Sequence, residues 1–289
     1  MRGAVTAGML MALYDLGLQR VFDSAYGSSA GAINLTYFLT GQREGVDVYA
    51  ERLTNKAFID PARIWRRDGW VLDLGFLLED VMQGAVPLDW EGVLRHEIPL
   101  KAAASCISSL KPVMLDGFRD AGDLLTCLRA SANVPVIAGS PMPLRGHLLV
   151  DAAVFEPVPF PMALRDGCTH VLALCSRPDP SRQPRGGLLA SPVRRAVRGL
   201  VRRAVLSPAY MRPAWDARLK QDIVRGMEVD DVLSSSLEEG AAEGDGASVF
   251  PVFPGPPAAF APLCTDPTVV AAGVRDGAEA VLATFDSVL

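Results

Sequence analysis

The sequence predicts an α/β fold with three layers (α/β/α) and a mostly parallel central sheet. Two observations favour this class. Short apolar segments rich in strand-forming residues alternate with longer segments of helical periodicity, which is typical of parallel strands covered by helices on both faces of a sheet. In addition, the β-prone segment 21–26 leads through a tight glycine- and serine-rich turn into a helix. Such strand–turn–helix connections are building units of α/β folds.

The first elements end at clear stop signals. Apolar residues recur with helical spacing over 4–16, and Gly17 ends this helix. A second helix runs over 32–39 and ends at Gly41. We interpret the following segment, 42–98, as mostly helical.

The rest of the chain continues the alternation. We predict strands near 100–107, 112–116, 148–150, 171–174 and 247–253, and helices over 123–130, 191–206 and 267–284. The segment 228–246 is acidic and contains glycine and serine, which indicates a surface loop. We expect a single domain over 1–289, whose motifs lie in 1–176, with the basic helix, the acidic loop and the closing helix in 177–289.

Composition excludes several classes of protein. Hydrophobic residues make up 49% and charged residues 21% of the 289 residues, which suits a packed globular protein. The net charge of −5 gives no reason to expect nucleic acid as a partner. The five cysteines are odd in number and show no C-x-x-C spacing, which favours a reducing, cytoplasmic compartment. We find no secretory signal and no apolar run long enough for a membrane-spanning helix.

The most informative motif is Gly27-Ser28-Ser29-Ala30-Gly31, which reads G-x-S-x-G between a strand and a helix. This context is that of a nucleophile elbow. The small residues Gly27 and Gly31 would let the backbone turn sharply and pack closely, while Ser29 would present its hydroxyl at a helix N-terminus, where developing negative charge is favoured. Ser29 is therefore the candidate nucleophile; the alternative is an ordinary βα turn.

A serine nucleophile needs a base, and Asp151 is the best candidate. It follows the short apolar segment Leu148-Leu149-Val150, and ligand-binding and catalytic groups gather at the carboxyl ends of strands in open parallel sheets. Hydrogen-bonded directly to Ser29, this carboxylate could accept the proton without an imidazole, and partial burial would raise its proton affinity. The alternative is a carboxylate that only caps a turn.

The three histidines fit the role of base less well. His96 lies in the polar stretch Arg95-His96-Glu97, His147 lies in a predicted loop, and His170 begins an apolar strand. Only His170 follows Asp151 in the chain, which leaves a Ser-Asp-His order open. However, the base of such triads lies on a loop beyond a late strand rather than at the start of one.

At this point the chain resembles the patatin-like phospholipase family, whose members use a serine–aspartate dyad. The resemblance covers about residues 1–176 and consists of ordered motifs. These are Arg2-Gly3 with Gly8, similar to the end of the family's glycine-rich oxyanion loop, the elbow at Gly27–Gly31, the small-residue segment 130–135, and Val150-Asp151-Ala152-Ala153 with its proline-containing sequel, 156–159. The resemblance implies that N–H groups near Arg2 and Gly3 hold the oxyanion.

Two departures from the family pattern affect what is expected. Ala152 stands where the family has glycine after the aspartate, and a positive φ there would strain an alanine. The family's first strand and leading glycines have no counterpart ahead of Met1. Because one oxyanion donor is worth about 10²–10³ in rate, two interpretations stay open: Met1 is internal to a longer gene product, or this is a weakened or inactive member.

The resemblance implies a lipid acyl ester hydrolase of the phospholipase or acylglycerol lipase type, with Ser29 and Asp151 as the dyad and without a metal or organic cofactor. Two alternatives remain. One is a catalytically impaired protein of this fold that binds lipid or acts as a scaffold, and the other is a transacylase. Head-group class and oligomeric state are not indicated by the sequence.

Two apolar features of the sequence can each be interpreted in two ways. The segment 191–206 is basic and amphipathic. It indicates either peripheral contact with a membrane or lipid-droplet surface or a helix packed on the core with a solvated basic face. A second group of apolar residues either lines an acyl pocket or belongs to the core. It comprises Trp65, Trp70, Phe76, Leu77 and Leu78.

Overall fold

The computed structural model describes residues 1–179, 247–255 and 263–286. The predicted basic helix 191–206 and acidic loop 228–246 lie outside these residues. The N-terminal part contains α1 (Gly3–Asp15), η1 (Leu18–Arg20), β1 (Ala25–Ser28), α2 (Ala30–Leu39), α3 (Glu44–Glu51), α4 (Arg63–Arg66), the π-helix η2 (Phe76–Ala85) and α5 (Trp90–Leu94). Then follow β2 (Leu100–Cys106), β3 (Lys111–Leu115), α6 (Ala121–Ala132), β4 (Met142–Leu144), β5 (His147–Val150), η3 (Ala152–Val154), α7 (Phe160–Arg165), β6 (His170–Leu174), β7 (Ser248–Val252) and α12 (Pro267–Asp286).

The sheet is mixed, and the predicted α/β class is confirmed. β1 pairs with β2 in parallel, and β6 pairs with β7 in parallel as a separate two-stranded sheet. The antiparallel pairs are β2 with β3, β2 with β5, and β4 with β5. The connections β2–β3 and β4–β5 are hairpins, whereas β1 and β2 are joined through helices.

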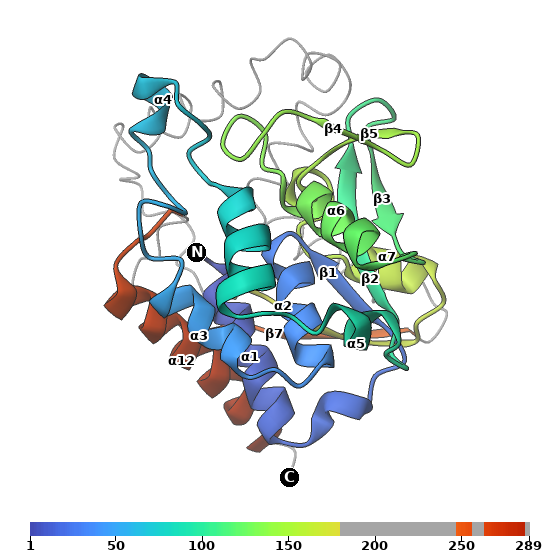
Figure 1. The fold of residues 1–289 in the computed structure, drawn as a ribbon. Coiled ribbons are helices and arrows are strands. Elements are labelled where there is room, and N and C mark those ends of the chain that lie inside the picture. Colours follow the sequence, from blue (N-terminus) through green and yellow to red (C-terminus); the bar gives the residue numbers. More distant parts are fainter. Residues whose placement is uncertain (180–246, 256–262, 287–289) are drawn as a thin grey trace, which may run out of the picture.

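Helices cover both faces of the sheet, which gives the three layers (Figure 1). The elements α2 and α6 pack on β1 and β2 from one side. The elements η3 and α7 contact the same strands from the other side. Successive side chains of a strand point to opposite faces, and accordingly Gly27 faces α2 while Tyr26 faces α7, where its hydroxyl donates to Asp166 Oδ2 (2.7 Å).

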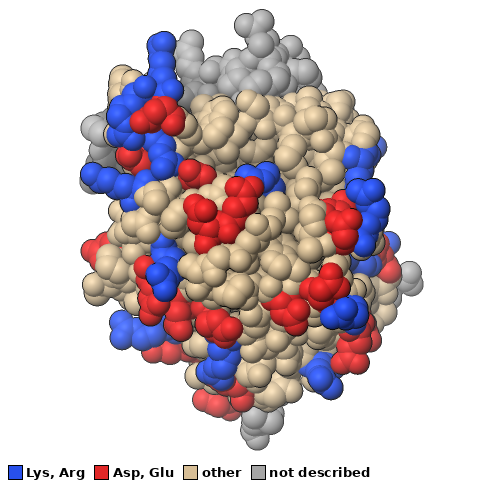
Figure 2. All heavy atoms as spheres, in the orientation of Figure 1, with Lys and Arg blue, Asp and Glu red and all other residues tan. Residues whose placement is uncertain are grey.

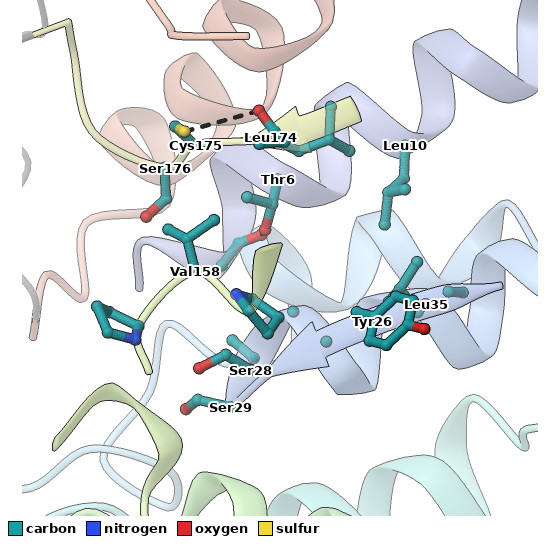
Figure 3. Close-up of a pocket in the computed structure, with 18 of the residues that line it drawn as sticks. Thr6, Leu10, Tyr26, Ser28, Ser29, Leu35, Val158, Leu174, Cys175 and Ser176 are labelled. Carbon is teal, nitrogen blue, oxygen red and sulfur yellow. Dashed lines mark hydrogen bonds between the residues drawn. The ribbon is translucent and has the colours of Figure 1, made fainter. Parts of the chain in front are cut away.

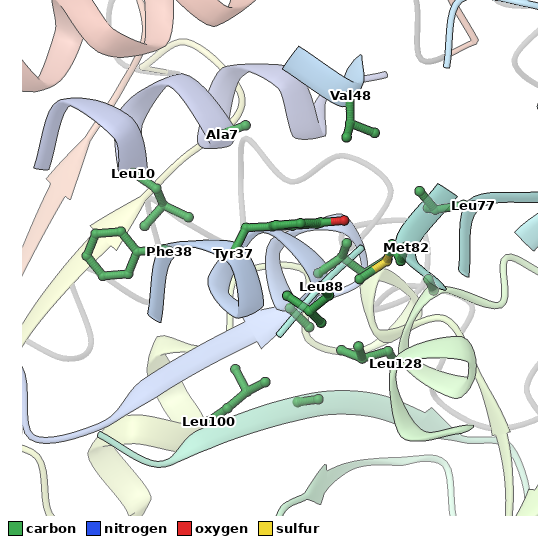
Figure 4. Close-up of a cluster of buried hydrophobic side chains, with 14 of the residues drawn as sticks. Ala7, Leu10, Tyr37, Phe38, Val48, Leu77, Met82, Leu88, Leu100 and Leu128 are labelled. Atoms are coloured by element: carbon green, nitrogen blue, oxygen red, sulfur yellow. The ribbon is translucent and has the colours of Figure 1, made fainter. Parts of the chain in front are cut away.

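The main core lies between α1, α2 and the elements that follow them (Figure 4). Figure 4 shows Leu10 of α1, Phe38 of α2 and Leu100 of β2 converging from three elements. Met82 of η2 and Leu128 of α6 close the same cluster, and both are fully buried. The core therefore holds α2 tightly, and with it the turn that precedes α2.

The predicted boundaries hold for most elements, with two corrections. The strand expected over 21–26 is β1 at Ala25–Ser28, because pairing with β2 begins only at Ala25 opposite Leu100. The segment 42–98 is less helical than expected, since long irregular stretches separate its helices. Gly17 and Gly41 both adopt positive φ directly after their helices, as the stop signals predicted.

Candidate active site

The elbow is a sharp turn between β1 and α2. Ser29 stands between them with φ of 53° and ψ of −123°, a conformation that costs a non-glycine residue roughly 1–3 kcal/mol. A Cβ atom at Gly27 would lie 2.3 Å from Ala32 Cα, so the approach of β1 to α2 requires glycine. A Cβ atom at Gly31 would meet nothing within 4 Å. The close packing expected of both glycines therefore applies only to Gly27.

Ser29 and Asp151 form a hydrogen-bonded pair. The Ser29 hydroxyl donates to Asp151 Oδ2 at 2.6 Å, and the N–H of Ala153 donates to Asp151 Oδ1 at 2.8 Å. Asp151 is only 2% exposed. Burial raises the pKa of this carboxyl to about 6, against the opposing effect of the two donors. Asp151 is therefore ionised at neutral pH but has a higher proton affinity than an exposed aspartate.

The strand register brings these two residues together. Ser28 pairs with Ala103 of β2, and Val150 pairs with Ser105 of the same strand. One residue further along each strand, Ser29 and Asp151 flank the same position of β2. The predicted position of Asp151 at the end of a buried strand is confirmed. The expectation that this strand is parallel to its neighbours is wrong, because β5 runs antiparallel to β2.

The end of α6 ties the two halves of the pair to each other. Ser131 Oγ accepts a hydrogen bond from the N–H of Ser29 at 2.9 Å. The carbonyl of Asn133 accepts from the N–H of Asp151 at 2.9 Å, while its side-chain Nδ2 donates to the carbonyl of Ser140. Segment 130–135 was recognised as a motif, but the contacts of Ser131 with Ser29 and of Asn133 with Asp151 were not predicted, because they join residues distant in the chain.

Arg2 and Gly3 lie beside the elbow. Both line the cavity described below, and a Cβ atom at Gly3 would come within 2.7 Å of Ala30 Cβ. The buried Asn34 holds this segment, since its Nδ2 donates to the carbonyl of Gly3 at 2.8 Å and its Oδ1 accepts from Tyr49 Oη at 2.7 Å. Nothing in the sequence pattern marked Asn34 as part of the site.

No histidine is hydrogen-bonded to Ser29, whose N–H and hydroxyl donate to Ser131 and Asp151. His170 lines the cavity, but its ring Nδ1 pairs with the hydroxyl of Thr169 at 3.0 Å. Ala152 does not have a positive φ, so an alanine is not strained at that position.

A large cavity of about 1380 Å³ opens at the pair. Figure 3 shows Ser29 at the end of β1, with Val158 and Leu174 facing the same space. Leu77 also lines this cavity, which agrees with the acyl-pocket reading of that residue, and Leu78 belongs to the core. Trp65 and Trp70 neither line the cavity nor belong to the core, because both are exposed, so both interpretations are wrong for these two residues.

The described part of the chain contains neither a metal-binding cluster nor a membrane-spanning helix. No group of three or more histidine, cysteine, aspartate or glutamate side chains there is arranged to hold a metal ion. No helix there combines the length and the apolar character needed to cross a membrane.

The fold and the strand–elbow–helix unit define an α/β protein with a serine at a strained turn. A family model described as Patatin-like phospholipase matches residues 1–164. The chain therefore belongs to the patatin-like phospholipase family, and this membership indicates a lipid acyl hydrolase acting on lipid substrates. No curated protein matches the chain.

Proposed function

We propose that this protein hydrolyses acyl esters of lipids with Ser29 as nucleophile and Asp151 as base. The single observation that supports this most strongly is the 2.6 Å hydrogen bond from the Ser29 hydroxyl to a buried carboxylate. The pair lies at a cavity larger than the roughly 300–1,000 Å³ of ordinary small-molecule sites. Leu10, Phe38 and Leu53 are among the apolar residues that line it, which suits a long acyl chain.

The reaction follows from this geometry. Asp151 takes the proton of Ser29 as Oγ attacks the ester carbonyl, and the tetrahedral oxyanion forms beside the start of α2. The N–H groups of Ala30 and Gly31 lie before Ala32, the first residue of α2 whose N–H donates within the helix, and can therefore donate to the oxyanion. The family resemblance adds N–H groups near Arg2 and Gly3. The proton passes from Asp151 to the departing alcohol. A water molecule, deprotonated by Asp151, then attacks the acyl-serine, and Asp151 returns this proton to Ser29 Oγ as the fatty acid is released.

The decisive experiment is labelling with a fluorophosphonate probe together with turnover of a short-chain ester. We expect the probe to modify Ser29, and Ser29→Ala to abolish both labelling and turnover while the circular dichroism spectrum is unchanged. Ser28→Ala is the matched control, because the Ser28 hydroxyl is buried and has no hydrogen-bond partner among the described residues. Labelling at Ser28, or unchanged turnover in Ser29→Ala, contradicts the proposal.

Transfer and scaffolding remain measurable alternatives. Acyl transfer to added glycerolipid in preference to water identifies a transacylase. Lipid binding without any ester turnover by the intact protein identifies a scaffold. We also propose that residues 1–289 form one domain, and the packing of α12 on α1 supports this.

A further inference from the structure

Residues 60–71 form a protrusion that is closed at its base. The N–H of Asp60 donates to the carbonyl of Val71 at 2.8 Å, and the N–H of Asp73 donates to the carbonyl of Phe58 at 2.9 Å. An antiparallel bridge joins Ile59 to Leu72 between these bonds. Figure 1 shows α4, which lies within the protrusion, standing away from the body of the protein at the upper left.

The tip of this protrusion exposes large apolar side chains. Trp65 is 86% exposed, Ile64 62% and Trp70 44%. Single exposed apolar residues are common and need no explanation, but tryptophan is normally largely buried. Two tryptophans and an isoleucine exposed within seven residues form an apolar patch, which is typical of an interaction surface.

Hydrogen bonds fix the backbone that presents this patch. The Arg63 guanidinium, whose side chain is only 16% exposed, donates to the carbonyls of Trp70 (3.1 Å) and Ala57 (2.9 Å). Asp60 Oδ1 accepts from the N–H of Ala62 at 3.0 Å, and Asp60 Oδ2 accepts from Arg66 at 2.7 Å. The apolar side chains are therefore held outward by a braced turn.

The protrusion carries a small net positive charge. Residues 60–71 include three arginines and two aspartates, a net charge of +1, and Figure 2 shows basic side chains with acidic ones among them over the region of α4. Arg63 also pairs with Asp73 at the base. Asp60 and Asp68 both pair with Arg66 and balance its charge, so the exposed Arg67 supplies the positive charge beside Trp65. Tryptophan next to arginine is the composition that favours the head-group region of a bilayer with anionic lipids.

The base of the protrusion is continuous with the candidate active site. Phe58 and Leu72, which flank the protrusion, both line the cavity that contains Ser29 and Asp151. A surface that seats the tip would therefore lie next to the same cavity. This continuity favours a lipid surface over a protein as the partner.

We propose that the tip of protrusion 60–71 inserts Trp65 and Ile64 into the head-group region of an anionic phospholipid bilayer. The purpose of this docking, delivery of lipid to the cavity, rests on the proposed function. The docking itself requires no hydrolysis, so it is tested separately.

The experiment uses the full chain carrying Ser29→Ala and measures co-sedimentation with two kinds of vesicle. One contains phosphatidylcholine alone, and the other contains equal parts of phosphatidylcholine and phosphatidylserine. We expect binding mainly to the anionic vesicles, with weakening at high salt. The double change Ile64→Ser and Trp65→Ala should weaken this binding about tenfold or more, because it removes most of the inserted apolar area. Leu282→Ala on α12 is the matched control, since Leu282 is also exposed (40%) but lies on another element.

Two more readouts make the outcome decisive. Trp65→Phe should reduce the blue shift of tryptophan emission that vesicles cause in the parent, because Trp70 on the same protrusion also contributes to it, and Arg67→Glu should weaken binding to anionic vesicles several-fold. Unchanged vesicle binding in the Ile64/Trp65 variant overturns the inference, as does equal loss in Leu282→Ala. Loss of self-association or of binding to a protein, with vesicle binding intact, assigns the patch to a protein and also overturns it. Suppose that vesicles bind through the tip but the protein with the native Ser29 hydrolyses no ester. That result contradicts only the proposed function and leaves the docking inference standing.

Discussion

The elbow and the protrusion place side chains in opposite ways. At the elbow, the carboxylate of Asp151 is held inside, 2% exposed, by donors from Ser29 and Ala153. At the protrusion, the indole of Trp65 is held outside, 86% exposed, on a turn braced by Arg63. A buried charge and an exposed indole each cost free energy.

The comparison shows how the two regions differ in what supports them. The elbow depends on packing as well as hydrogen bonds, since Gly27 lies against α2 and the core holds α2. The protrusion depends on hydrogen bonds and ion pairs over most of its length, because residues 61–70 are almost all exposed. Changes to the packing at the elbow, as at Gly27, should therefore affect chemistry and folding together, whereas changes at the tip of the protrusion should affect only contact with a surface.

The largest effect is expected from the pair itself. Ser29→Ala and Asp151→Asn should each lower kcat for a soluble ester by at least about 10⁴-fold, because the two residues act as a unit. The double variant should then be little worse than either single variant. A kinetic comparison of the three proteins tests this. Additive losses, or a mild Asp151→Asn beside a severe His170→Ala, would show that Asp151 is not the base.

A smaller effect is expected from packing at the elbow. Gly27→Ala should destabilise the fold by about 1–3 kcal/mol, because the new methyl group must push Ala32 away. It should also lower activity about 10²-fold by displacing the nucleophile. Gly31→Ala is the matched control and should leave stability unchanged or raised, since a methyl group there meets nothing. Urea denaturation of both variants makes the comparison, and equal stability losses would contradict it.

The pH profile should report the burial of Asp151. The base must be ionised, so activity should fall about tenfold per pH unit below a midpoint near pH 6, the raised pKa of this carboxyl. Since the folded protein holds this proton more tightly than the unfolded chain, stability should decrease as pH rises from about 4 to about 6. Asp151→Asn should remove that decrease. A midpoint near pH 4 would show that the carboxyl is not desolvated in solution.

The smallest effect is expected from the brace of the protrusion. Arg63→Met removes the donors to the carbonyls of Trp70 and Ala57 but keeps an apolar stem. We expect hydrolysis of vesicle lipid to fall about two- to fivefold, since the turn loses the three hydrogen bonds of Arg63 to backbone carbonyls and its ion pair with Asp73. Hydrolysis of a soluble ester should be unchanged. Equal losses on both substrates would mean that the brace supports the cavity rather than the tip.

Local patterns predicted the backbone elements well. The glycine stops at Gly17 and Gly41, the strand before Asp151 and the last helix all depend on neighbours in sequence, and all are present. The pairing of Ser29 with Asp151 was proposed from a motif, and the two side chains do meet.

Contacts between distant residues could not be predicted in the same way. Ser131 reaches Ser29 across 102 positions of the chain, and Asn34 reaches Gly3 across 31 positions that include α1 and β1. The exposure of Trp65 and Trp70 contradicts the usual rule for apolar residues, because they stand on a protrusion that the rule does not anticipate.

The crossing of α1 and α12 has a consequence for how the protein is made. A Cβ atom at Gly8 would lie 1.8 Å from the carbonyl oxygen of Val274, and one at Gly277 would lie 2.0 Å from that of Val5. These backbones touch although the first and last described helices are separated by most of the chain (Figure 1). During synthesis, α1 emerges from the ribosome long before its cover does. The face of α1 that α12 covers therefore lacks this cover until residues 267–286 have been made, so the contact between the two helices forms late in folding.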